Sequence, residues 1–171
     1  MGSSAAVPST STVPWGTRTS QLALEKVISG GQTGADQGGL EAARRAGIPT
    51  GGFAPEGFLT EDGPQPELGT RYGLTEGPGG YDDRTIRNVR AADATVLFAR
   101  KPGSDGTRLT LETLARLGKP HIVNPTPAEL RAFLVEHRVR ILNVAGNRES
   151  LAPGLAAEVE HGLFTAFTAL D

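Results

Sequence analysis

The chain lacks cysteine altogether, and aromatic residues make up only 5% of its 171 residues. Without cysteine it cannot form disulfides, use a thiolate nucleophile, or bind zinc or iron–sulfur clusters through sulfur. No apolar run reaches the length of a membrane span, and no signal-peptide core follows Met1. The net charge of −2 provides no basic field for nucleic acid. We therefore expect a cytoplasmic protein that binds neither membranes nor nucleic acid.

The N-terminal residues differ in composition from the rest of the chain. Residues 1–22 are rich in Ser, Thr, Ala and Pro and show no apolar periodicity. Such a segment buries too little apolar surface to offset the entropy that is lost on ordering. We expect a flexible extension over residues 1–22 and a single ligand-binding domain over residues 23–171.

The stretch from Ile28 to Gly39 leads from apolar residues through closely spaced glycines into an alanine-rich helical pattern. Glycines let the backbone turn tightly, and a helix N-terminus adds free N–H groups and a partial positive charge. Together they favour an anion site, with a plain tight turn as the alternative. The stretch matches neither the dinucleotide-binding nor the P-loop motif. Thr33 and Asp36 have the spacing of a capping box, which predicts a helix start here.

Strand and helix patterns alternate along the rest of the chain. We expect strands at Lys26–Ser29, Thr50–Phe53, Thr95–Ala99, His121–Asn124 and Val139–Val144. We expect helices at Ala35–Ala46, Asp83–Ala91, Thr107–Leu117, Thr126–His137 (opened by a Thr126–Glu129 capping box) and Ser150–Ala169. This order predicts an α/β fold with a parallel sheet covered on both faces. The glycine- and proline-rich stretch from Ala54 to Tyr81 is expected to be a long functional loop or an oligomer contact.

Two further strand-to-helix junctions resemble the first in composition. Arg100–Arg108 and Ala145–Ser150 each combine glycine with cationic residues, and both follow predicted strands. Because ligands of such sheets bind beyond the carboxyl ends of the strands, three junctions at one edge favour an anionic ligand. Arg148 and Arg108 could bind phosphate bidentately. Arg84 and Asn88, four residues apart, either line this crevice or bond to neighbouring backbone.

Several motifs resemble those of the molybdenum cofactor (Moco) carrier protein family, over roughly residues 25–167. They are Ser29–Asp36, Glu61–Pro64 through Tyr72–Glu76, Arg84-Thr85-x-x-Asn88-Val89, Gly106-Thr107, and Asn143–Ser150 without position 147. The resemblance implies a Rossmann-like, doubly wound fold, often a homotetramer, that holds phosphorylated molybdopterin. The wider group includes the Lonely-Guy-type, lysine-decarboxylase-like phosphoribohydrolases, which carry a second-loop pattern like P-G-G-x-G-T-x-x-E. Here Asp105 replaces one of those glycines, Thr110 occupies the glutamate position, and Glu112 follows two residues later.

These observations predict a protein that binds and protects or delivers the molybdenum cofactor, with molybdoenzymes as recipients. We expect no catalytic residue and no protein-bound metal, because the pterin dithiolene would carry the molybdenum and the three histidines are scattered. The alternatives are a nucleoside 5′-monophosphate phosphoribohydrolase, for which Asp36, Asp105, Glu112 and Glu149 are the candidate acids, and a nucleotide-binding sensor. The predicted binding residues are Gly30, Gly31, Gln32, Thr33, Gly34, Ala35, Asp36, Ser104, Asp105, Gly106, Thr107, Arg108, Gly146 and Arg148.

Overall fold

The computed structural model of the protein describes residues 22–169, and its centre is a sheet of five parallel strands. The strands are β1 (Lys26–Ser29), β2 (Thr50–Gly51), β7 (Ala94–Phe98), β8 (His121–Val123) and β9 (Ile141–Gly146), in the order β2-β1-β9-β7-β8. Neighbouring side chains of a strand enter opposite cores: Val96 belongs to the larger core and Leu97 to a smaller one. A sheet buried on both faces explains the nearly continuous apolar strands.

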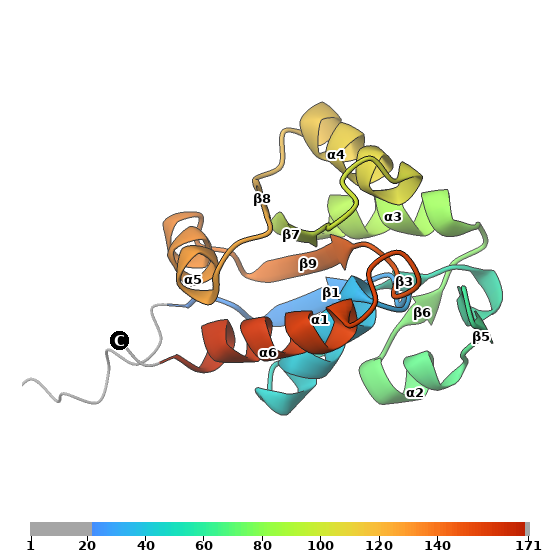
Figure 1. The fold of residues 1–171 in the computed structure, drawn as a ribbon, viewed down its shortest axis with the longest axis horizontal. Helices are drawn as coiled ribbons and strands as arrows, with labels where there is room; N and C mark the ends of the chain where they lie inside the picture. The colour runs from blue at the N-terminus through green and yellow to red at the C-terminus, as the bar shows by residue number, and fades with distance from the viewer. Residues whose placement is uncertain (1–21, 170–171) are drawn as a thin grey trace, which may run out of the picture.

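Helices cover both faces of this sheet (Figure 1). On one face lie α1 (Ala35–Arg45), α5 (Pro127–Glu136) and α6 (Leu155–Thr168), and on the other lie α3 (Tyr81–Ala91) and α4 (Asp105–Leu117). The helix α1 lies close to the sheet because it carries glycine where it crosses β9. A Cβ atom at Gly39 would lie only 2.5 Å from Cγ1 of Val144. The predicted doubly wound α/β fold is confirmed.

The stretch expected to be a long loop contains small elements of its own. A short parallel pair joins β3 (Phe53–Ala54) to β6 (Thr75–Glu76), and a hairpin joins β4 (Leu59–Thr60) to β5 (Gly63–Pro64). A 3₁₀ turn (η2, Glu56–Phe58) and the helix α2 (Glu67–Tyr72) complete this part. Leu68, Tyr72 and Leu74 form a small core with Leu40 of α1. The prediction of a long loop was wrong, because a few apolar residues without any periodicity suffice to pack this stretch against α1.

Other differences lie at element boundaries. The predicted strand Thr50–Phe53 is split at Gly52, whose φ of +122° turns the chain from the main sheet to β3. The predicted last helix begins five residues late, at Leu155, because Gly154 at its N-cap is left-handed. The capping box predicted at Thr33 and Asp36 is wrong: the N-cap is Gly34, and no side chain caps it.

Several local predictions are confirmed. The Thr126–Glu129 capping box is present, with both of its hydrogen bonds at 3.2 Å. The first strand has the predicted bounds, Lys26–Ser29. The predicted extension lies outside the described residues except for Leu22, which packs against the main core. Within residues 22–169, no helix is long and apolar enough to cross a membrane.

Candidate functional site

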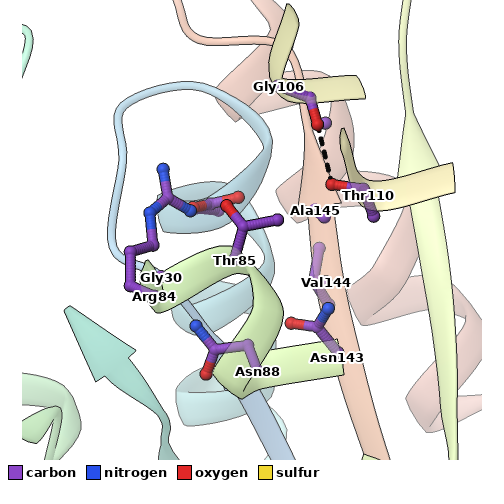
Figure 2. Close-up of a pocket in the computed structure, with 11 residues that line it drawn as sticks. Gly30, Arg84, Thr85, Asn88, Gly106, Thr110, Asn143, Val144 and Ala145 are labelled. Carbon is purple, nitrogen blue, oxygen red and sulfur yellow. Dashed lines mark hydrogen bonds and ion pairs between the residues drawn. The ribbon is translucent and has the colours of Figure 1, made fainter. Parts of the chain in front are cut away.

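A cleft opens at the carboxyl edge of the sheet, between α3, the start of α4 and the loops that follow β1 and β9. Its outer part has a volume of about 420 Å³, and a chamber of about 40 Å³ lies beneath it. Four residues line both parts: Arg84, Thr85, Gly106 and Gly146. In Figure 2, α3 carries Arg84, Thr85 and Asn88 on one side of the chamber, and β9 and the first turns of α4 form the other. This is the edge at which ligands of doubly wound sheets bind.

The three predicted junctions do meet at this cleft. Eight of the predicted binding residues line it: Gly30, Gln32, Asp36, Ser104, Asp105, Gly106, Gly146 and Arg148. The other six do not line it and lie close in the chain to residues that do: Gly31, Thr33, Gly34, Ala35, Thr107 and Arg108. Five of these six are buried; the sixth, Arg108, is exposed and pairs with Asp105 at 2.6 Å.

Three backbone amides of the first loop are already engaged within the protein. The N–H of Gln32 donates to Oδ2 of Asp36 at 3.1 Å, and that of Thr33 donates to Oε1 of Gln32 at 3.0 Å. The N–H of Ala35 donates to the carbonyl oxygen of Asn147 at 3.1 Å. These amides are therefore not free to bind an anion, although the loop has the predicted shape.

Asp36 forms an ion pair at the floor of the cleft and does not cap α1. Its Oδ2 lies 3.0 Å from Nη1 of Arg84, and only 4% of the Asp36 side chain is exposed. Desolvation raises the pKa of Asp36, and the charge of Arg84 and the hydrogen bond from Gln32 offset this only in part. Gly30 makes room for the pair, because a Cβ atom there would lie 2.1 Å from Nη1 of Arg84. The Nε atom of Arg84 is buried without a hydrogen-bond partner among the described residues.

Glu61 ties the first loop to the third. Its Oε1 accepts hydrogen bonds from the hydroxyl of Thr33 at 2.5 Å and from the N–H of Ser150 at 3.0 Å. Its Oε2 accepts from the Ser150 hydroxyl and lies 3.2 Å from Nε of Arg148. Desolvation raises the pKa of Glu61, but the hydrogen bonds from Ser150 and Thr33 and the charge of Arg148 outweigh it and lower the pKa. The sequence argument missed this role, although Glu61 stands in one of the family-like motifs.

Asn147 joins the second and third loops in a similar way. Its Oδ1 accepts from the N–H of Lys101 at 2.7 Å, and its Nδ2 donates to the carbonyl oxygen of Lys101 at 3.1 Å. Ser104 caps α4, because its hydroxyl accepts from the N–H of Thr107. Among the described residues, no hydrogen bond occupies the N–H of Asp105 or Gly106, and both residues line the cleft. The start of α4 therefore presents free amides and the positive end of a helix dipole.

Comparison with known proteins agrees with this architecture. Residues 27–167 match the circularly permutated YpsA SLOG family. The chain belongs to this family. A crystal structure of a candidate molybdenum carrier protein from Syntrophus aciditrophicus SB is 32% identical and superposes with a TM-score of 0.77. The match covers 86% of this chain and 97% of the other. A search of curated proteins gives no match. The predicted resemblance to the Moco carrier family is thereby confirmed.

The helix α3 supplies cleft residues that the sequence argument left open or missed. In this SLOG family chain, Arg84 lines the cleft, whereas Asn88 both lines the chamber and holds the backbone of Phe53 through two hydrogen bonds of 2.9 Å. Tyr81 and Thr85 also line the cleft. Thr85 stands in one of the family-like motifs but was given no role, and Tyr81 was not singled out. Positions 81, 84, 85 and 88 have the i, i+3, i+4, i+7 spacing of one helical face. That spacing was the available signal.

Of the four acids considered for hydrolysis, Asp36 and Asp105 line the cleft, whereas Glu112 and Glu149 do not. Thr110, at the position where the related hydrolases carry glutamate, lines the chamber, and its hydroxyl donates to the carbonyl oxygen of Gly106 at 2.8 Å. Glu112 is exposed and does not line the cleft. Glu149 accepts from the N–H of Gly154 and Ala156 at the start of α6. Within residues 22–169, no three His, Asp or Glu side chains form a group that could hold a metal.

The arginines of the second and third loops differ in whether they face the cleft. Arg100 turns away from the cleft toward α6, where it pairs with Glu158 and donates to the carbonyl oxygen of Pro153 at 2.8 Å. Arg148 lines the cleft with half of its side chain exposed. Arg84 and Arg148 are therefore the arginines that face the cleft.

Proposed function

We propose that this protein binds a phosphorylated pterin, the molybdenum cofactor, as cargo in the cleft and holds it without converting it. The observation that carries the proposal is the convergence of the free amides at the start of α4 with Arg84 and Arg148 on one cleft of about 420 Å³. The description of the Syntrophus relative as a candidate molybdenum carrier protein supports the choice of cargo.

The phosphate of the cargo would bind at the start of α4. Free N–H groups of Asp105 and Gly106 and the helix dipole attract an anion there. The carboxylate of Asp105 would oppose this, but Arg108 pairs with it at 2.6 Å and reduces its charge effect. Arg148 would add a charge-assisted hydrogen bond to the phosphate. We therefore place the principal anion site at the start of α4 rather than at the first glycine loop, where the amides of Gln32, Thr33 and Ala35 are engaged.

Two features favour binding over hydrolysis. Thr110 supplies a hydroxyl where a phosphoribohydrolase of the wider group has its carboxylate, and Glu112 does not face the cleft. Asp36, the buried acid of the chamber, is held by Arg84 and by the N–H of Gln32. A buried carboxylate that is held by an arginine and a backbone amide is poorly placed for general acid–base work.

Mass spectrometry of ligands that co-purify from a host that makes the cofactor tests the proposal. We expect a pterin phosphate on the wild type and about tenfold weaker retention on Arg148→Ala, the lower end of the cost of losing a charge-assisted hydrogen bond. Arg116→Ala is the matched control, because Arg116 is exposed in the last turn of α4, away from the cleft. A wild type that retains no pterin, or equal losses in both variants, would overturn the assignment.

Assembly and delivery complete the proposal. The family resemblance suggests a homotetramer with symmetric contacts. In this role the protein works in the cytoplasm, protects the bound pterin from oxidation and passes it to molybdoenzymes.

A further inference from the structure

Tyr81 stands out among the exposed apolar side chains of the described residues. Four large ones are exposed, namely Leu59, Tyr81, Leu117 and Val123, and of these four only Tyr81 lines the cleft. It is the first residue of α3, and 39% of it is exposed. An aromatic ring at the rim of a ligand cleft offers a flat apolar face to whatever enters.

The backbone and the neighbours of Tyr81 hold this ring in place. The hydroxyl of Thr85 donates to the carbonyl oxygen of Tyr81 at 2.9 Å and fixes the first turn of α3. The guanidinium carbon of Arg84 lies 5.6 Å from the centroid of the Tyr81 ring, within cation–π range. Arg84 is itself anchored on the buried Asp36 at 3.0 Å. Two planar groups therefore lie next to each other on the cleft side of one helix.

We infer that Tyr81 and Arg84 form a stacking platform for the planar ring of the ligand, so that Tyr81 selects a fused heteroaromatic ring. This inference rests on the proposed function, because it concerns the ring of a ligand whose phosphate binds at the start of α4. Aromatic and guanidinium faces both stack on heteroaromatic rings, whereas neither recognises a phosphate through its face. Leu151 lines the same cleft and adds apolar surface.

The ring and the phosphate of the ligand would contact different residues, so binding of each can be measured independently. Losing a stacked aromatic side chain typically weakens binding of a ring by about tenfold or more. Binding of an anion without a ring does not change, because the amides of Asp105 and Gly106 and the side chain of Arg148 remain. Tyr81→Leu keeps the apolar bulk and removes the aromatic face, and Tyr81→Phe keeps the face and removes the hydroxyl.

The test is a titration of the full chain with 6-hydroxymethylpterin monophosphate, followed by pterin fluorescence, and with inorganic phosphate, followed by amide NMR shifts. We expect the wild type and Tyr81→Phe to bind the pterin alike and to quench its fluorescence. Tyr81→Leu binds it about tenfold more weakly with less quenching, while its phosphate binding is unchanged. Leu117→Ala, at an exposed apolar residue far along α4, behaves as the wild type.

The outcomes separate this inference from the proposed function. A wild type that does not bind the pterin overturns the proposed function, and the stacking inference with it. Pterin binding that is equal in the wild type and Tyr81→Leu overturns the stacking inference alone. Equal weakening of both probes in Tyr81→Leu also overturns it, because the residue would then act on the structure of the whole cleft.

Discussion

The Glu61 carboxylate holds the first and third loops together, and Glu61→Gln should release them. The glutamine keeps one oxygen for Thr33 and the Ser150 N–H, but presents an NH₂ group to the Ser150 hydroxyl and to Arg148. The variant therefore loses an ion pair, and its remaining hydrogen bonds are neutral. Each charge-assisted bond is worth about 1.5–3 kcal/mol, and partial exposure of Arg148 reduces this. We expect a loss of about 1–2 kcal/mol in the free energy of unfolding.

Urea denaturation and hydrogen exchange measure this effect. At neutral pH the Gln variant should unfold at lower urea, and the amides of Glu149 and Ser150 should exchange faster than in the wild type. Because the folded pKa of Glu61 is lowered from 4.5, its contribution is present above that pH and is lost as the pH falls through the folded pKa. The difference between the two proteins should therefore shrink in acid.

The matched control is Glu67→Gln in α2. Glu67 is exposed, and its substitution removes the same negative charge. It should alter stability by less than about 0.5 kcal/mol. If Glu61→Gln unfolds and exchanges like this control, the hydrogen bonds and ion pair of Glu61 do not hold the first and third loops together.

Three further predictions concern the packing of α1, hydrolysis and assembly, the last from the family resemblance. Gly39→Ala should destabilise the protein by about 1–3 kcal/mol, because the added Cβ atom would lie 2.5 Å from Val144. Gly162→Ala, where the added atom meets open space, should not destabilise it, and thermal melts of the two variants test the difference. The wild type should release negligible base from AMP, and Glu112→Gln should leave pterin binding unchanged; robust release that this substitution abolishes would favour the hydrolase alternative. Light scattering should show a tetramer, and a particle of 17.8 kDa at micromolar concentration would contradict it.

Local patterns were reliable where local chemistry sets the structure. Apolar β-branched residues predicted β1 to the residue, and the Thr126–Glu129 capping box formed as its spacing indicates. The same logic failed at Thr33, because its hydroxyl has a better partner in Glu61 than in the start of α1. A capping pattern predicts a cap only when no tertiary partner competes for the side chain.

The candidate site shows the same division. Glycines and cations placed three junctions at the carboxyl edge of the sheet, and all three meet there. The pattern could not indicate which amides remain free. The N–H of Ala35, for example, donates to the carbonyl oxygen of Asn147, which is 112 residues further along the chain. The sequence argument left open whether Arg84 lines the cleft. It does so in the structure, where Gly30 has no Cβ atom to block the arginine side chain.

The sequence by itself determined the alternation of strands and helices, and hence the parallel sheet and the edge at which the cleft lies, because periodicity and turn residues act over a few positions. The tertiary structure alone decided which side chains face the cleft and which partners engage them. Asp36 meets Arg84 across 48 positions, and Glu61 meets Ser150 across 89. Contacts of this span depend on how the helices cross the sheet, and no local pattern records that geometry.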